Sequence, residues 1–170
     1  MNHNIILIGY MGSGKSTVAK ELYAKTGMEV IDTDALIVKE QGRSINEIFQ
    51  TEGEESFRRL ETELLRRLSE SVSSYILSTG GGMPVREENR AILKSLGTVF
   101  FLKADTETIL KRVKGDTQRP LLQGTDQRAR IAGMLKARTP MYELTAHHRI
   151  ETDGKTIEEV VNEILCLARK

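Results

Sequence analysis

The chain has 170 residues, of which 29% are charged and 39% hydrophobic. This composition is typical of one ordinary globular domain and not of a disordered chain. The formal net charge is +1 and only 5% of the residues are aromatic. These values disfavour a nucleic-acid-binding ATPase, which would combine a basic groove with aromatic side chains that stack on bases. The single cysteine, Cys166, excludes an intramolecular disulfide and a cysteine-based metal site.

The apolar runs of the chain are short. The N-terminal run, within MNHNIILIG, is too short for a signal peptide and follows no basic segment. No stretch approaches the roughly 20 apolar residues that a transmembrane helix needs. We therefore expect a cytoplasmic protein that has neither a membrane nor a nucleic acid as its partner.

Five apolar runs of strand length recur along the chain, with segments of helical periodicity between them. The helical pattern is clearest over residues 57–68, 109–113 and 157–167. Strands that alternate with helices predict βαβ units and a parallel sheet covered on both faces. Since no repeat or Pro/Gly-rich linker divides the sequence, we expect one α/β domain over residues 1–170. The expected strands are residues 5–9, 28–32, 75–79, 98–102 and, more weakly, 148–152.

The first expected strand runs into GYMGSGKS, residues 9–16, which matches G-x-x-x-x-G-K-[ST] in full. Its glycines let backbone N–H groups converge on phosphate oxygens, and the start of the following helix adds partial positive charge. In such a loop Lys15 reaches the β- and γ-phosphates, while Ser16 offers its hydroxyl to Mg²⁺. The position between a strand and a helix makes a chance glycine-rich turn a poor alternative.

A phosphate-binding loop alone does not define a function, because GTPases, ATPase motors and small-molecule kinases share it. The chain is too short for a motor with accessory regions, and it holds no N-K-x-D-like segment for guanine. The polar stretch GDTQRPLLQGTDQ, residues 115–127, contains two glycines and a proline, which indicates an exposed loop. These features favour a small kinase that covers bound ATP.

Two carboxylates, Asp32 and Asp34, end the second apolar run in EVIDTD. If the strand extends through both, they point the same way, because side chains alternate with a period of two. Ligands of parallel α/β sheets bind beyond the carboxyl ends of the strands. We therefore expect both aspartates at the edge that carries the phosphate-binding loop, where different partners keep both ionised.

Three further segments are candidates for the acceptor side of the site. The triple glycine after the third strand, residues 80–82, removes side chains, so that a ligand can approach the backbone amides. In GEESFRRLE, Arg58 flanks the apolar face of a helix, and Glu61 is placed to pair with it one turn on. Arg119 and Arg138 are candidates because arginine binds carboxylates and phosphates bidentately. Taken singly, each arginine is more often a surface residue than a ligand.

Together these segments resemble the shikimate kinases, and the resemblance extends along almost the whole chain. The phosphate-binding loop is common to many families, whereas the order of DTD, FRxxE, GGG, RPLL and RxPxY is specific. The segments that carry the resemblance are GYMGSGKST (9–17), DTD (32–34), IFQTEGEESFRRLE (48–61), STGGG (78–82), RPLL (119–122) and RTPMYELTA (138–146).

The resemblance implies a three-layer P-loop kinase fold, with a five-stranded parallel sheet in the order 2-3-1-4-5 flanked by helices. It also implies a substrate-binding helical region at about residues 33–61, a lid at about residues 114–125 and a monomer. The implied reaction transfers the γ-phosphate of ATP to the 3-hydroxyl of shikimate. The products are shikimate 3-phosphate and ADP, on the pathway to chorismate and the aromatic amino acids.

By the same resemblance, Lys15 and Arg119 stabilise the transferring phosphoryl group, and Asp34 orients the attacking hydroxyl or also accepts its proton. One Mg²⁺ ion accompanies ATP and is held by Ser16 and, through water, by Asp32. The residues implied to bind the nucleotide are Gly12, Ser13, Gly14, Lys15, Ser16, Thr17, Arg112 and Arg119.

For the acceptor, the resemblance implies that Arg58 and Arg138 bind the carboxylate of shikimate and that Phe49 and Phe57 wall its pocket. The residues implied to bind shikimate are Asp34, Phe49, Phe57, Arg58, Gly80, Gly81, Gly82 and Arg138.

The sequence departs from the family pattern in two places. Residues 152–156, opposite the adenine-stacking Arg112, lack the proline of some members, and no acidic residue ends the third strand. Two alternatives stay open. One is another small P-loop kinase, such as a gluconate or nucleoside monophosphate kinase, and the paired arginines with DTD favour shikimate over it. The other is a nucleotide-binding regulatory protein without catalysis, against which the intact Lys15, Asp34 and Arg119 argue.

Overall fold

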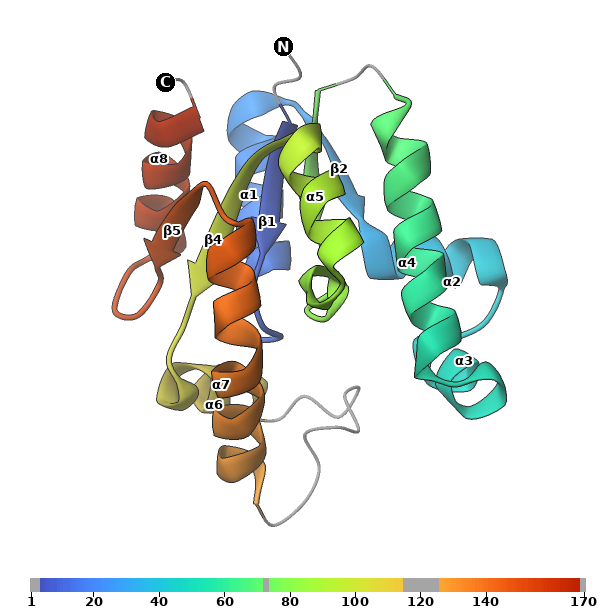
Figure 1. The fold of residues 1–170 in the computed structure, drawn as a ribbon. Helices are drawn as coiled ribbons and strands as arrows, with labels where there is room; N and C mark the ends of the chain where they lie inside the picture. Colours follow the sequence, from blue (N-terminus) through green and yellow to red (C-terminus); the bar gives the residue numbers. More distant parts are fainter. Residues whose placement is uncertain (1–3, 72–73, 115–125, 169–170) are drawn as a thin grey trace.

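The computed structural model describes residues 4–71, 74–114 and 126–168. Five strands form one parallel sheet in the order β2-β3-β1-β4-β5, which confirms the expected topology (Figure 1). Each strand begins and ends within one residue of its expected bounds. The strands are β1 Asn4–Ile8, β2 Glu29–Asp32, β3 Tyr75–Ser78, β4 Gly97–Lys103 and β5 His148–Glu151.

Helices connect the strands throughout the described part of the chain. None of these helices is long and apolar enough to cross a membrane. Of the lid expected at about residues 114–125, all but Lys114 lies outside the described residues, and Arg119 lies there with it. The helices are α1 Lys15–Thr26, α2 Thr33–Gln41, α3 Ile45–Glu52, α4 Glu54–Ser69, the 3₁₀ helix η1 Met83–Val85, α5 Glu87–Leu96, α6 Thr106–Val113, α7 Gln127–Thr145 and α8 Ile157–Ala168.

The central strand β1 is covered on both faces. Ile5 and Leu7 pack with α1 and α8, whereas Ile6 and Ile8 pack with α5, α6 and α7 on the other face. All four side chains are buried, and full burial of one such side chain contributes roughly 1.5–3 kcal/mol. The alternation therefore produces the three-layer arrangement, in which α5 and α7 lie in front of the sheet in Figure 1.

A smaller unit, formed by α2, α3 and the first part of α4, lies beside the sheet, at the right of Figure 1. A capping box starts α3: Ser44 Oγ accepts from the N–H of Glu47, and Glu47 Oε2 accepts from the N–H of Ser44. The unit occupies residues 33–61, the segment for which the sequence predicts substrate binding. Its buried apolar side chains are Ile37, Ile48, Phe57 and Leu64.

The strand β2 ends at Asp32, as expected, and does not extend to Asp34. Asp32 is the last residue of β2, and its Oδ1 accepts from the N–H of Ala35 at 3.0 Å, which caps α2. Asp34 lies in the first turn of α2, where a negative side chain is favoured by the helix dipole. The period-two argument for these two residues was therefore wrong, because the helix begins between them.

The longest helix, α7, was not among the clear sequence predictions. It runs through Pro140, a residue that usually ends or kinks a helix because it lacks an N–H and clashes with the preceding turn. Only Ile131, Tyr142 and Thr145 are buried along its 19 residues, so the apolar pattern that indicates a helix is weak. The helix nevertheless carries Arg138 towards the carboxyl edge of the sheet.

Candidate active site

The phosphate-binding loop leaves the carboxyl end of β1 and enters α1. Gly9, Gly12 and Gly14 have φ values of 148°, 78° and 98°, which residues with a β-carbon rarely adopt. A β-carbon on Gly9 would also lie 2.6 Å from the carbonyl oxygen of Leu102 in β4. The glycines of the motif are therefore required by the backbone itself, and the loop has the conformation of a phosphate cradle.

Lys15 folds back over this loop. Its Nζ donates to the carbonyl oxygens of Gly9 and Tyr10, at 2.7 and 3.1 Å. Ser13 is buried, and among the described residues its hydroxyl has no hydrogen-bond partner. Ser16 and Thr17 lie exposed in the first turn of α1. The ammonium and the hydroxyls thus surround the start of the helix, as an anionic phosphate requires.

Arg112, near the end of α6, reaches the same loop. Its guanidinium donates to the carbonyl oxygen of Gly12 at 3.2 Å and to the hydroxyl of Thr152 at 3.4 Å. The contact with Thr152 brings the start of the segment 152–156 next to Arg112, as expected for the two walls of an adenine site. The structure therefore places all the described nucleotide-site candidates around one loop.

The triple glycine forms the opposite side of the site, and each glycine faces one predicted side chain. A β-carbon on Gly80 would lie 2.6 Å from Asp34 Oδ1, and one on Gly82 would collide with the guanidinium of Arg58. A β-carbon on Gly81 would lie 3.6 Å from an Arg138 nitrogen, which is an ordinary contact. The turn thus brings together side chains from α2, α4 and α7.

Arg58 is held by two glutamates of its own helix. Its guanidinium donates to Glu61 at 2.7 Å and to Glu54 at 3.1 Å, which confirms the expected pair with Glu61. The Glu61 side chain has no exposed surface, whereas 68% of Glu54 is exposed. The inner and outer partners of the guanidinium therefore differ strongly in their access to water.

Burial raises the pKa of Glu61 to about 7, although the positive charge of Arg58 opposes this shift. The negative charge of Asp34 adds to the increase, whereas the positive charge of Arg138 opposes it. Among the described residues, Glu61 Oε1 has no hydrogen-bond partner. The carboxyl group consequently retains a proton well above its ordinary range of pH.

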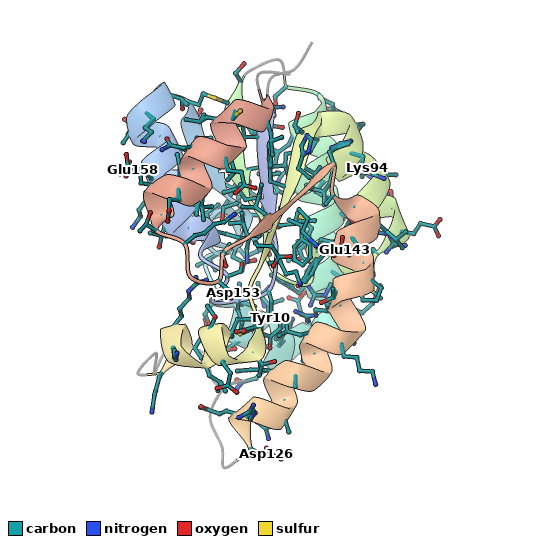
Figure 2. The ribbon with its side chains drawn as sticks, turned by 90° about the vertical axis from the view of Figure 1, so that its left-hand side faces the viewer. Tyr10, Lys94, Asp126, Glu143, Asp153 and Glu158 are labelled. Atoms are coloured by element: carbon teal, nitrogen blue, oxygen red, sulfur yellow. The ribbon has the colours of Figure 1, made fainter. Side chains whose placement is uncertain are left out.

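Arg138 is positioned by two tyrosines that the sequence did not single out. Its guanidinium lies 5.9 Å from the ring centre of Tyr10 and near the hydroxyl of Tyr142, which donates to the carbonyl oxygen of Gly81 at 2.6 Å. Burial raises the pKa of Tyr142 to about 12, so the hydroxyl keeps its proton. Figure 2 shows Tyr10 at the lower edge of the sheet, close to α6 and α7.

The remaining candidates line the acceptor side. Phe49 and Phe57 are in edge-to-face contact with ring centres 5.2 Å apart, and the Arg58 guanidinium lies 5.5 Å from the ring centre of Phe57. The hydroxyl of Thr33, another residue that the sequence did not single out, accepts from the N–H of Gly80 at 2.9 Å. This bond ties the glycine turn to the start of α2, next to Asp34.

The fold, the phosphate-binding loop and the charged side chains around the triple glycine together define the class of the protein as a P-loop kinase of a small molecule. The model of the shikimate kinase family matches residues 11–168. A shikimate kinase of Geobacter sulfurreducens is 46% identical over 167 residues, which cover 98% of this chain and 91% of the relative. One of Symbiobacterium thermophilum is 42% identical and covers 95% and 94%. The chain belongs to the shikimate kinase family.

Solved structures agree with this result. A shikimate kinase from Acinetobacter baumannii in complex with shikimate superposes with a TM-score of 0.90 at 38% identity, covering 96% of this chain and 91% of that one. The shikimate kinase from Aquifex aeolicus gives 0.80 at 37% identity, with 98% and 96% covered. A gluconokinase from Sinorhizobium meliloti gives 0.64 at 16% identity over 98% and 91%, which shows the fold alone.

Replacement of Glu61 by glutamine tests the burial of this carboxyl group. Because its pKa is raised from 4.5 to about 7 on folding, the folded chain binds more protons than the unfolded chain in that pH window. The free energy of unfolding then falls as the pH rises from about 4.5 to 7. We expect Glu61→Gln to remove this slope in urea titrations of the unliganded protein at pH 5 to 8. Glu63→Gln, exposed on the same helix, is the control, and parallel curves for wild type and Glu61→Gln would contradict the raised pKa.

Proposed function

We propose that this chain transfers the γ-phosphate of ATP to the 3-hydroxyl of shikimate, giving shikimate 3-phosphate and ADP in chorismate biosynthesis. One observation carries the proposal: Asp34, Arg138 and Arg58 converge on the three glycines 80–82. Two arginines beside one aspartate suit an acceptor that has both a carboxylate and hydroxyl groups. Family membership supports the same acceptor.

The acceptor is held at its carboxylate by Arg58 and Arg138. Both guanidiniums are oriented before substrate arrives, Arg58 by Glu61 and Arg138 by Tyr142, so little side-chain freedom is lost on binding. Asp34 orients the 3-hydroxyl towards the γ-phosphate and is the candidate acceptor of its proton. The pocket wall of Phe49 and Phe57 packs against the ring of the substrate.

The nucleotide lies with its phosphates over residues 9–17. Lys15 exchanges its bonds to the carbonyl oxygens of Gly9 and Tyr10 for the γ-phosphate, where its positive charge offsets the charge of the transition state. Arg112 stacks on adenine. Arg119, in the lid outside the described residues, adds a second positive charge and helps to exclude water.

Ser16 and Asp32 fit a single Mg²⁺ ion, because hydroxyl and carboxylate oxygens are its preferred protein ligands. Asp32 pairs with Ser78, which pairs with Leu7 of β1, so it stands two strand spacings, about 10 Å, from β1. The resemblance to the family implies that Asp32 would hold the ion through water. When bound, the ion neutralises charge on the phosphates. Among the described residues no group of three or more acidic, His or Cys side chains could hold a metal alone.

We also propose that the enzyme acts as a monomer in the cytoplasm. Among the described residues, the large hydrophobic side chains that are exposed lie on four different elements and include Tyr23 on α1 and Leu144 on α7. Scattered residues of this kind do not make an interface.

ADP release should require shikimate, ATP and Mg²⁺ together. We expect turnover of shikimate in a coupled ADP assay, and none of gluconate or nucleoside monophosphates, because those acceptors do not match the two arginines and the aspartate. Quinate also carries a carboxylate and hydroxyl groups, so its turnover in the same assay tests how closely the ring of the acceptor must fit the pocket. Turnover of a different acceptor without turnover of shikimate would refute the proposed function.

Asp34→Asn should lower kcat by at least about 100-fold, because the side chain no longer accepts a proton or orients the hydroxyl as strongly. ATP binding, measured by calorimetry, should change less than about twofold, because the nucleotide contacts lie elsewhere. Asp126→Asn, at the exposed start of α7, is the matched control, since asparagine caps a helix as well as aspartate. An unchanged kcat for Asp34→Asn would remove its proposed role.

Gly82→Ala should displace Arg58 without unfolding the chain, because the new β-carbon meets the flexible end of that side chain. We expect the affinity for shikimate to fall by about tenfold or more as the carboxylate loses a well-aligned bidentate partner. Nucleotide affinity should stay constant. Gly133→Ala, which adds a β-carbon where nothing lies within 4 Å, controls for the substitution, and unaltered shikimate affinity for Gly82→Ala would contradict the steric argument.

A further inference from the structure

A buried polar bridge joins α4 to η1 and α5, outside every site described so far. Asn89, fully buried in α5, donates from Nδ2 to the carbonyl oxygen of Met83 at 3.0 Å. Its Oδ1 accepts from the hydroxyl of Thr62, which is 3% exposed on α4, at 2.8 Å. One side chain thus connects the residue after Gly82 with a helix that carries substrate-site residues.

Both ends of the bridge lie next to the proposed carboxylate clamp. Thr62 follows Arg58 by one helical turn, and its hydroxyl lies 3.1 Å from the Arg58 carbonyl oxygen. Met83 directly follows Gly82, and its N–H donates to the carbonyl oxygen of Gly80 at 3.1 Å. The bridge therefore determines how the glycine turn sits against the turn of α4 that presents the guanidinium.

Gly82 and the guanidinium of Arg58 are packed closely together. The space that a β-carbon of Gly82 would need is already filled by the guanidinium, so a small shift of the turn towards α4 moves Arg58. A shift away from α4 would separate the amides of residues 80–82 from the guanidinium. These two parts of the proposed acceptor site would then no longer be aligned with each other. The position of the glycine turn relative to α4 therefore determines whether Arg58 and the amides of residues 80–82 are aligned for the proposed acceptor.

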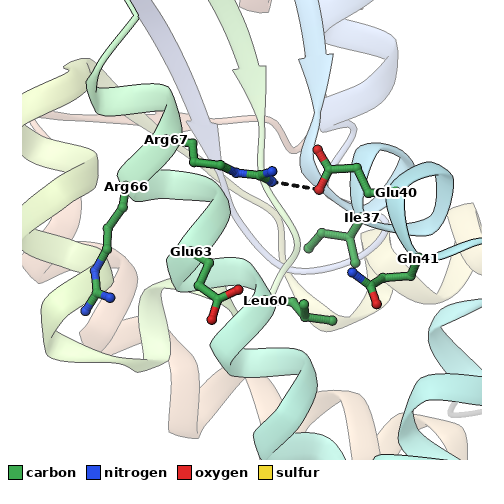
Figure 3. A pocket seen from close by; sticks show the side chains of 7 residues that line it. All are labelled: Ile37, Glu40, Gln41, Leu60, Glu63, Arg66 and Arg67. Carbon is green, nitrogen blue, oxygen red and sulfur yellow. Dashed lines mark hydrogen bonds and ion pairs between the residues drawn. The ribbon is translucent and has the colours of Figure 1, made fainter.

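The other flank of α4 packs against α2 and α3 mainly through apolar side chains. There α2 and α4 meet through Ile37 and Leu60, and Arg67 pairs with Glu40 at 2.7 Å (Figure 3). A hollow of about 320 Å³ remains between the two helices, and the Arg67–Glu40 pair is partly exposed. An exposed ion pair beside a hollow adds little positional precision, and the buried hydrogen bond between α4 and a neighbouring helix lies on the Asn89 side.

An apolar side chain could fill the space of Asn89 if stability alone were required, because replacing a buried polar group and its partners by apolar ones is often neutral. A buried asparagine instead favours the one arrangement in which its bonds are all made. We propose that Asn89 is a positioning residue for shikimate binding, which holds the glycine turn at the distance from α4 that the Arg58 clamp needs. This inference rests on the proposed function.

The chain offers a matched control in Asn4. It is 1% exposed, and its amide likewise joins two segments, although both partners are backbone groups: Nδ2 donates to the carbonyl oxygen of Leu96 at 2.8 Å and Oδ1 accepts from the N–H of Tyr75 at 3.0 Å. It lies at the amino ends of the strands, away from the site. Asn89→Ala and Asn4→Ala therefore remove the same group from the same kind of environment.

In steady-state kinetics we expect Asn89→Ala to raise the KM for shikimate by about tenfold, the change that follows when a charge-assisted contact is misaligned. The KM for ATP should stay within about twofold, because none of the hydrogen bonds of the bridge involves residues 9–17. Asn4→Ala should leave both KM values unchanged while its Tm falls by a comparable amount. An unchanged shikimate KM for Asn89→Ala, or an equal increase for Asn4→Ala, would overturn the inference.

Two further measurements keep the inference separate from folding and from the identity of the acceptor. Thr62→Val keeps the volume but removes the hydroxyl, and it should raise the shikimate KM in the same direction even if Asn89→Ala does not fold. The Arg58 side-chain N–H resonance, recorded without substrate, should shift in Asn89→Ala and Thr62→Val but not in Asn4→Ala. If it shifts while the wild type does not turn over shikimate, only the proposed function fails. If it does not shift in either variant, the positioning role fails.

Discussion

The contact on which the site depends is the close approach of a backbone turn to charged side chains. Gly80 and Gly82 lie where any β-carbon would displace Asp34 or Arg58, and Gly81 borders Arg138. Side chains from three helices can therefore meet around one segment of main chain only because that segment has no side chains of its own. The parallel sheet supplies the turn at the end of β3, and the helices supply the charges.

The charges are balanced before any ligand binds. Two arginines and two carboxylates share a largely buried space, and isolated charges there would be costly. The balance explains why Glu61 has its pKa raised to about 7 rather than far higher: burial favours the neutral acid, and Arg58 favours the carboxylate. Burial raises the pKa of Tyr142 to about 12, so its hydroxyl is neutral at neutral pH. Tyr142 therefore lies beside Arg138 without adding a third negative charge.

The parallel sheet and several of its covering helices could be predicted from the apolar runs, and the order of the strands followed from the resemblance to the shikimate kinases. The start of α2 directly after β2 could not, because Asp32 caps a helix with a side chain that also suits a strand end. The helix through Pro140 was hidden by a residue that normally stops one. The bridge between Thr62 and Asn89 joins positions 27 residues apart, and a single buried asparagine leaves no periodic signal in the sequence.

The two partners of Arg58 suggest how an acceptor carboxylate enters without dismantling the site. Glu61 is fully buried and bonds one guanidinium nitrogen, whereas Glu54, on the other nitrogen, is mostly exposed. An exposed ion pair contributes little free energy, so under the proposed function the bond to Glu54 is the one that a substrate carboxylate would replace at low cost. Removing Glu61 would instead leave a buried charge uncompensated. The inner glutamate therefore stays with the guanidinium, and the outer one occupies the face that the acceptor takes.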